Sequence, residues 1–187
     1  DCHFFHEALN REMDHRGFAS VEEMNEYMIK RWNEKVRNRD EVVILGDLSM
    51  GNAEQTNALL DRLQGKLFLI VGNHDNRYLR SKIFHKERFG WIYPYAELHD
   101  DGRKVVLSHY PIACYNGQYL KNKKGEPRTY MLYGHVHDSH DERLIEQYQQ
   151  MVEKTRIPDR DGGTQSLSSH MINCFCMYSD YQPLSLD

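Results

Sequence analysis

Two continuous apolar runs, each closed by a glycine, constrain the fold of this chain more than any other feature. Residues 42–45 end at Gly46, and residues 67–71 end at Gly72. A strand buried on both faces has this unbroken apolar pattern, whereas a strand with one solvated face alternates polar and apolar residues. The two runs therefore predict neighbouring strands of a sheet that is covered on both sides.

Helices are expected before and between these strands. Apolar residues recur at helical spacing in residues 20–39 and in residues 52–63. Ser20 is a suitable N-cap, and Glu23, three positions later, completes a capping box. Helices that alternate with buried strands are typical of an α/β fold.

The later part of the chain has a different rhythm. Asp101-Gly102 is a hairpin turn signal, and residues 91–98 and 104–107 flank it as the two strands of the hairpin. The remaining segments predict a strand, a helix, a loop and a last strand, over 129–133, 139–154, 158–169 and 171–178 respectively. We therefore expect one domain over residues 1–187, with two sheets, helices outside them and a further strand preceding residue 1.

Composition argues against several classes of protein. The net charge is −4, which argues against a stable nucleic-acid partner. No apolar run reaches the ~20 residues of a membrane span, and no signal-peptide pattern opens the chain. Four cysteines in 187 residues do not make a disulfide scaffold. We therefore expect a cytoplasmic protein with reduced cysteines and no membrane partner.

Histidines and acids gather where the predicted strands end. The chain holds 11 histidines beside 28 acidic residues. The side chains suited to bind metal at the chain start or just after strands are Asp1, His3, Asp47, Asn73, His109, His135 and His137. Ligands of open α/β sheets bind at the carboxyl ends of strands. Such a set suits two divalent ions that share one carboxylate, and its mixed imidazole and carboxylate ligands suit Mn, Fe, Zn or Ni.

Five short motifs follow one another between residues 1 and 137. They are Asp1-x-His3, Gly46-Asp47, Gly72-Asn73-His74-Asp75, Ser108-His109-Tyr110-Pro111 and Gly134-His135-x-His137. In this order the set resembles that of the calcineurin-like metallophosphoesterase superfamily, in its small bacterial and phage forms. The resemblance implies a four-layer α/β/β/α sandwich with two mixed sheets.

The resemblance also implies a role for each matched residue. The implied ligands of one metal ion are Asp1, His3 and His137, those of the other are Asn73, His109 and His135, and Asp47 bridges both. His74 is expected to protonate the leaving group, and Asp75 to orient the His74 ring.

The implied activity is hydrolysis of phosphodiesters or small phosphorylated metabolites, by attack of a metal-bridging hydroxide on phosphorus. Manganese is the favoured metal. Asp47 is followed neither by the arginine that grips phosphate in phosphoprotein phosphatases nor by the tyrosine ligand of purple acid phosphatases. What remains resembles the small bacterial and phage phosphoesterases, which include phosphodiesterases and enzymes of broad specificity. Within this resemblance we favour a phosphodiesterase over a phosphomonoesterase.

Other residues near these motifs have two interpretations each. His6 either contacts substrate phosphate or caps the following helix. Tyr110, with Tyr115 and Tyr119, either stacks on an aromatic part of the substrate or packs in the protein. The basic residues of 121–128 either steer an anion or form a solvated loop. The pair Cys174-x-Cys176 lacks a second cysteine pair for zinc and is expected to be reduced.

Two other functions compete with a small-molecule phosphoesterase. A binding scaffold of the same fold would tend to lose His74 or a metal ligand, and this chain keeps both. A nuclease acting on short oligonucleotides is the second alternative, since the acidic balance speaks only against long duplexes. The expected partner is a small phosphorylated substrate, and no sequence feature indicates the oligomeric state.

Overall fold

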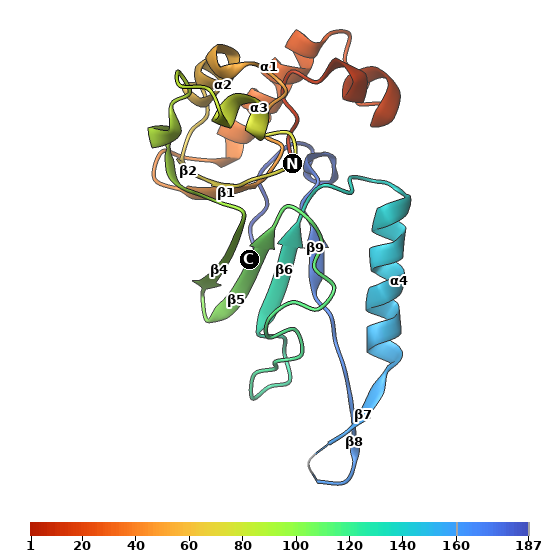
Figure 1. Ribbon diagram of the computed structural model, residues 1–187. Coiled ribbons are helices and arrows are strands. Elements are labelled where there is room, and N and C mark those ends of the chain that lie inside the picture. Colours follow the sequence, from red (N-terminus) through yellow and green to blue (C-terminus); the bar gives the residue numbers. More distant parts are fainter. Residues whose placement is uncertain (160, 187) are drawn as a thin grey trace.

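The computed structural model describes residues 1–159 and 161–186, and in this part of the chain two main sheets lie one against the other (Figure 1). The first sheet is parallel and has the order β1-β2-β3, with strands Glu41–Leu45, Lys66–Ile70 and Phe89–Tyr93. The second has the order β4-β5-β6-β9, with strands Tyr95–Asp100, Arg103–Ser108, Thr129–Tyr133 and Met171–Asn173. Here β4 and β5 are antiparallel, and the other pairs are parallel. The mixed α/β fold expected from the sequence is therefore present.

Helices cover the outer sides of these sheets (Figure 1). The α-helices are α1 (Val21–Lys35), α2 (Ala53–Leu60), α3 (Asn76–Leu79) and α4 (His140–Lys154). Short helical turns span Leu9–Met13, Lys86–Arg88 and Cys176–Ser179. The first three helices lie over the first sheet, and α4 runs beside β6 and β9. None of the helices in the described residues has the length and apolar character needed to cross a membrane.

The predicted helix starts are confirmed by their caps. The Ser20 hydroxyl accepts the Glu23 N–H at 3.1 Å, and Asn52 and Gln55 bond reciprocally at the start of α2. The Glu23 carboxylate, however, accepts the N–H of Ala19 rather than that of Ser20. Helix α1 also ends at Lys35, four residues before the predicted end.

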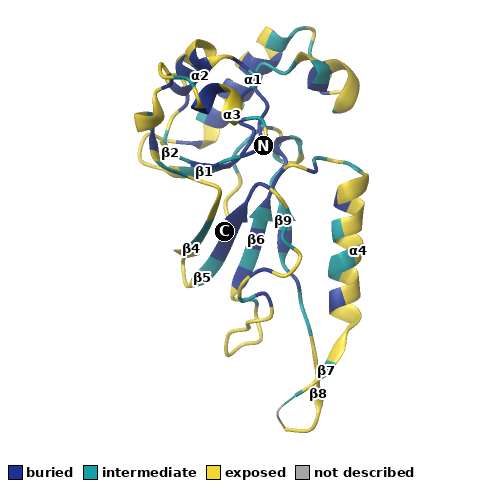
Figure 2. Ribbon diagram, in the orientation of Figure 1, coloured by how far each residue is buried: buried dark blue, intermediate teal, exposed yellow. Residues whose placement is uncertain are grey.

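Three apolar clusters hold the layers together. Met28 and Trp32 of α1 join Leu67 and Leu69 of β2 in the first cluster. Between the sheets, Leu45 and Ile70 of the first sheet meet Val105 and Leu107 of the second. Ile145 and Tyr148 of α4 pack against Val106, Met131 and Tyr133. Figure 2 shows the resulting pattern: β1, β2, β5 and β6 are mainly buried or half-buried, whereas β4, β7 (Arg156–Pro158) and β8 (Thr164–Ser166) are mainly exposed.

The predicted hairpin is confirmed at its turn and corrected in its first strand. Asp101 and Gly102 both have positive φ, 44° and 75°, as a two-residue turn of the I′ type requires. The segment predicted as one strand, residues 91–98, is divided at Pro94 between β3 of the first sheet and β4 of the second. Proline has no N–H to continue a ladder, so the chain changes sheets there.

Three further expectations need correction. The first sheet is parallel throughout the described residues, so only the second sheet is mixed. Residues 158–169 are not all loop, because Thr164–Ser166 (β8) pairs with Arg156–Pro158 (β7) in a small projecting hairpin. The last predicted strand, 171–178, ends at Asn173 and gives way to the turn at Cys176–Ser179. Arg160 in this predicted loop, and Asp187, lie outside the described residues.

The first residues of the chain run beside the end of β1. The N–H groups of Cys2 and His3 donate to the Asp47 carbonyl at 3.2 and 2.8 Å. Phe4 forms a parallel bridge with Ser49. Residues 1–4 are thereby held alongside the loop that follows β1.

Candidate metal centre

The two sheets bring the predicted ligands to one place. Asp47 and Asn73 follow β1 and β2 in the first sheet, and His109 and His135 follow β5 and β6 in the second. Two groups of potential metal ligands form there: Asp1, His3 and His137 in the first, and Asp47, His109 and His135 in the second. The convergence follows from the fold, because parallel strands present their carboxyl ends at the same edge.

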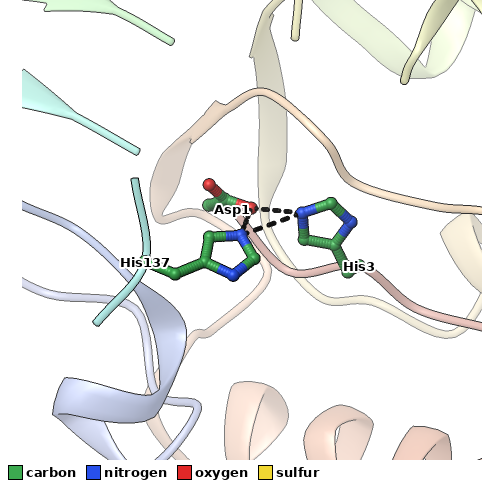
Figure 3. Close-up of side chains that lie close together, drawn as sticks. All are labelled: Asp1, His3 and His137. Carbon is green, nitrogen blue, oxygen red and sulfur yellow. Dashed lines mark hydrogen bonds and ion pairs between the residues drawn. The ribbon is translucent and has the colours of Figure 1, made fainter. Parts of the chain in front are cut away.

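The first group is compact (Figure 3), and its residues are buried or nearly so. Asp1 Oδ1 lies 2.9 Å from His3 Nε2 and 3.3 Å from His137 Nε2. The two ring nitrogens are 3.1 Å apart, although their residues are separated by 134 positions in the chain. Three ligand atoms thus form a triangle whose edges are all close to 3 Å.

The second group lies beside the first and is more open. Asp47 Oδ2 is 3.4 Å from His109 Nε2. Asn73 Oδ1 is 2.9 Å from the same nitrogen. The His135 ring centroid lies 5.0 Å from that of His109, and His135 is exposed.

Asp47 lies between the groups. Its Oδ1 accepts the His74 N–H at 2.8 Å. Its Oδ2 is 3.6 Å from His3 Nε2 and 3.4 Å from His109 Nε2. One carboxylate oxygen therefore faces both groups.

The donor set fits divalent cations. Ligand atoms bound at about 2.1 Å in tetrahedral or octahedral geometry lie about 3.0–3.4 Å apart, close to the spacings in the first group. His109 Nδ1 lies 2.8 Å from the Leu45 carbonyl. A carbonyl only accepts, so Nδ1 carries a proton, and Nε2, which faces the oxygens of Asn73 and Asp47, is the ring nitrogen that can bind a cation once it has lost its own proton. Asp1 Oδ1 is buried without a hydrogen-bond donor. A bound cation would accept the lone pair of His109 Nε2, and a cation would likewise give Asp1 Oδ1 the partner that it lacks.

Protonation states agree with metal ligation, which requires neutral imidazole and ionised carboxylate. Burial is the main cause that lowers the pKa of His3 to about 3. Burial raises the pKa of Asp47, but the His109 ring and the His74 N–H lower it by more, so the net pKa lies below its usual range. His3 is therefore neutral and Asp47 ionised at neutral pH.

Backbone strain is concentrated at the ligands. Four of them have left-handed backbone conformations: His3 (φ 54°), Asp47 (48°), His135 (68°) and His137 (49°). Such conformations cost of order 1–3 kcal/mol each outside glycine and gather at functional sites. The fold thus holds these side chains where an unstrained loop would not.

Asp75 does not have the contacts predicted for it. Its carboxylate accepts the N–H groups of Asp47, Leu48 and Gly72 at 2.9, 2.9 and 2.7 Å. The Tyr78 hydroxyl donates to it at 2.6 Å. These four donors occupy both oxygens, and among the described residues Asp75 makes no hydrogen bond to the His74 ring. Asp75 therefore fixes the loop that carries Asp47 instead of orienting His74.

His74 and Tyr110 lie at the mouth of the site. The His74 side chain is 42% exposed, and its Nε2 is 4.0 Å from Asp47 Oδ2. Tyr110 is 48% exposed, and its ring centroid is 4.5 Å from that of His135. Both can therefore reach a molecule bound at the site.

His6 adopts the capping arrangement. Its Nδ1 accepts the Leu9 N–H at 3.2 Å, so its Nε2 carries the proton in the neutral ring. The ring lies 5.5 Å from that of His3. Burial is the main cause that lowers the pKa of His6 to about 4. Capping does not exclude a contact from Nε2 to substrate.

The other residues that the sequence singled out have contacts typical of core or surface residues. Tyr115 is buried, and its hydroxyl accepts the His170 N–H at 2.8 Å, so it packs in the core. The basic residues Lys121, Lys123, Lys124 and Arg128 are exposed. Burial raises the pKa of Cys174 to about 11 and of Cys176 to about 12, which keeps both thiols protonated. Free thiols were expected, and the described cysteines form no disulfide.

Two residues of the site were missed by the sequence analysis. Asp14 Oδ1 lies 2.9 Å from His137 Nδ1, and the Arg16 guanidinium bonds to both Asp14 and the Cys2 carbonyl. Neither residue follows a predicted strand or belongs to a motif. No signal in a single sequence singles them out.

Comparisons with known proteins identify a matching family and two relatives. The family described as "Calcineurin-like phosphoesterase superfamily domain" matches residues 17–152, a span that begins after Asp1 and His3. The uncharacterized protein MJ1445 of Methanocaldococcus jannaschii is 34% identical over 142 residues, covering 75% of this chain and 68% of its own length. The gene 66 protein of Mycobacterium phage L5 is 29% identical over 163 residues, with 73% and 74% covered.

A solved structure has the same overall fold. The crystal structure of AQ665, a protein of unknown function from Aquifex aeolicus, superposes with a TM-score of 0.65 at 20% identity. The superposition covers 98% of this chain and 91% of that one.

Proposed function

Because the chain belongs to the calcineurin-like phosphoesterase superfamily, we propose that it is a hydrolase of phosphodiesters or small phosphorylated metabolites that works with two divalent metal ions. The observation that carries the proposal is the position of Asp47 Oδ2, 3.6 Å from His3 Nε2 and 3.4 Å from His109 Nε2. Asp47 could therefore help to hold a cation in either group. Paired ions of this kind are a common device for in-line displacement at phosphorus.

The protein's own groups have distinct tasks in this proposal. Bound cations would polarise a phosphoryl oxygen and lower the pKa of water. His74 would hold a proton at Nε2 and deliver it to the departing oxygen, and its 42% exposed side chain leaves room for that group. Asp75 would act indirectly, since its four hydrogen bonds hold the loop of Asp47 in place.

A diester is the favoured substrate because the Arg16 guanidinium, which bonds to Asp14 and to the Cys2 carbonyl beside the first group, is already engaged. Arg16 is buried, and its donors go to Asp14 and the Cys2 carbonyl. It therefore offers no hydrogen bond to the second negative charge that distinguishes a monoester from a diester. Tyr110 adds an exposed ring on which an aromatic leaving group could stack.

Two finer points of the expected family pattern also belong to this proposal. The three apolar clusters, one between helices and the first sheet, one between the sheets and one under α4, are those that a four-layer α/β/β/α sandwich would contain. The mixed nitrogen and oxygen donor set accommodates manganese, iron, zinc or nickel, with manganese the first ion to test.

Metal analysis combined with hydrolysis assays tests the proposal. The chain should bind two equivalents of manganese and hydrolyse a bis-aryl phosphodiester faster than an aryl phosphomonoester. Two bound ions without hydrolysis of either ester would favour a binding scaffold. A steep salt dependence on long DNA, absent on a dinucleotide, would favour a nuclease that makes several phosphate contacts.

His74→Ala tests the proton donor separately. The variant should keep both ions but lose about 10²–10⁴-fold in rate on diesters with poor leaving groups. The loss should be much smaller on nitrophenyl diesters, whose leaving oxygen needs no proton. His99→Ala, at an exposed histidine of β4, is the matched control. Equal slowing on good and poor leaving groups would contradict the assigned role.

A further inference from the structure

Asp14 and Arg16 lie between two parts of the chain that must meet to form the first ligand group. One part is residues 1–3, and the other is His137, 134 positions away from His3. Asp14 contacts the second part, since its Oδ1 lies 2.9 Å from His137 Nδ1. Arg16 contacts the first part, since its Nη1 donates to the Cys2 carbonyl at 2.8 Å.

The two residues are also joined to each other. Arg16 Nε and Nη2 both donate to Asp14 Oδ2, at 3.1 and 3.0 Å. The Arg16 side chain has no exposed surface, and that of Asp14 is 7% exposed. The rings of Phe175 and Tyr181 lie 6.0 and 5.8 Å from the guanidinium carbon. The result is a buried, hydrogen-bonded ion pair, the kind whose disruption is costly.

The segment that carries this pair is itself held in place. Asn10 Nδ2 donates to the Phe18 carbonyl at 2.8 Å, and the Phe18 N–H returns a bond to Asn10 Oδ1 at 2.9 Å. The Asp14 N–H donates to the Leu9 carbonyl at 3.2 Å. The turn between Asn10 and Phe18 is therefore closed at its base, which makes it a firm support.

We propose that Asp14 and Arg16 form a clamp that positions the first ligand group by holding His137 and the Asp1–His3 segment against each other. Both are positioning residues because each acts through another group: Asp14 contacts His137 Nδ1 rather than the Nε2 that lies near Asp1 and His3, and Arg16 contacts the Cys2 carbonyl. Asp14 fixes the orientation of the His137 ring so that Nε2 points toward Asp1 and His3. Arg16 ties that carboxylate to the backbone between the two other ligands. The proposal rests on the proposed function only in placing a cation at the first group.

Removal of the clamp should weaken one metal site and leave the other. Partners that orient a ligating histidine are typically worth 10–100-fold in metal affinity. Asp14→Asn keeps the size of the side chain but loses the charge that pairs with Arg16. Arg16→Met keeps the buried volume but loses every hydrogen bond. We expect either substitution to lower the affinity of the first group by about 10–100-fold.

Cobalt(II) titration gives a readout that does not depend on hydrolysis. Calorimetry and visible absorption should resolve two binding steps in the wild type, and only one should weaken in Asp14→Asn and Arg16→Met. His135→Ala, which removes a ligand of the second group, should weaken the other step and so assigns them. Arg62→Met is the matched control, because Arg62 pairs with Glu26 at 2.6 Å on the exposed surface.

A conservative variant separates positioning from general stability. Arg16→Lys retains a positive charge but reaches fewer acceptors, so its first-group affinity should lie between those of the wild type and Arg16→Met. Far-UV circular dichroism of the metal-free proteins shows whether each variant is folded. If Arg16→Met does not fold, Asp14→Asn and Arg16→Lys decide the matter.

The outcomes distinguish this proposal from the proposed function. Folded variants that bind both ions with wild-type affinity overturn the clamp, even if the wild type hydrolyses diesters. A wild type that binds two ions without hydrolysing any ester, while Asp14→Asn loses one step, supports the clamp and overturns the function. A wild type that binds no divalent ion overturns both.

Discussion

The two ligand groups share Asp47 but are built in different ways. The second group takes His109 from the end of β5, and Asn73 and His135 from just after β2 and β6, so the sheet ladders fix their positions. The first takes Asp1 and His3 from a segment beside β1, and it depends on side chains of Asp14 and Arg16. The first group is also buried, whereas the second opens to solvent at His135.

This difference shows which ligand residues a sheet can hold in position and which it cannot. Residues at strand ends are positioned by backbone hydrogen bonds that exist in any sequence with the same fold. Residues from a segment outside the sheets need further side chains to hold them. The first group should therefore be sensitive to distant substitutions and the second to changes of the strand ends.

The largest effect should come from Asp47→Ala, which tests whether the groups depend on one shared ligand. Both ions should bind much more weakly, and hydrolysis should fall by at least about 10³-fold, since metal polarisation contributes several kcal/mol. Metal content after gel filtration and hydrolysis of a bis-aryl diester measure the two effects. Asp61→Ala, at an exposed aspartate, is the control. One ion bound with unchanged affinity would show that the groups are independent.

Glycine substitutions should disturb one group at a time. Gly46 has φ +83°, and an added Cβ would lie against the His109 ring and 2.7 Å from Gly72 Cα. We expect Gly46→Ala to cost about 2–4 kcal/mol of unfolding free energy and to weaken the second group. A Cβ at Gly134 would lie 2.9 Å from Asp1 Cβ, so Gly134→Ala should cost about 1–2 kcal/mol and weaken the first group.

Urea unfolding and metal titration measure both variants. Gly125→Ala is the control, because Gly125 has φ +81° but open space around it, and it should cost only about 1 kcal/mol. If Gly46→Ala and Gly134→Ala weaken the same binding step, the assignment of ligands to groups is wrong.

A chelator should remove the metal ions of the two groups at different rates. The side chains of Asp1, His3 and His137 are 0%, 5% and 15% exposed, whereas His135 is an exposed residue. Since solvent access governs attack by a chelator, one equivalent should leave about tenfold faster than the other. His135→Ala, which removes one ligand of the second group, should make the fast phase faster and leave the slow phase unchanged. Release of both ions in a single phase would contradict the difference in burial.

The smallest effect should come from Tyr110→Leu. The exposed Tyr110 ring adjoins the second group, and loss of stacking should raise the KM of an aryl diester about fivefold, from roughly 1 kcal/mol. A dialkyl diester should be unaffected. Tyr119→Leu removes another exposed ring, 45% accessible, and should change neither KM. An equal rise for aryl and dialkyl diesters would contradict stacking.

Features set by local chemistry could be predicted from the sequence. The apolar runs that end at Gly46 and Gly72 became β1 and β2, and Asp101-Gly102 formed the expected turn. Ser20 and Asn52 capped their helices. Because strand ends meet at one edge, the convergence of Asp47 with His109 followed from the same reasoning.

Features that depend on tertiary contacts could not be predicted from the sequence. Asp14 and Arg16 acquire their roles only because the chain returns 123 positions later with His137. Asp75 stands beside His74 in the sequence, yet its carboxylate turns toward four donors around Asp47 and Tyr78. Pro94 indicated that residues 91–98 form two strands. The apolar residues on either side of Pro94 made the segment resemble a single strand.

The contact of the first residues with His137 has a consequence for how the protein is made. Pairing of segments so far apart in the chain is slow compared with local pairing, because a long loop must close first. During synthesis, the second group can assemble only after His135 leaves the ribosome, and the first only two residues later. Both groups are therefore completed almost together, so a chain that stops before His135 would carry neither assembled centre.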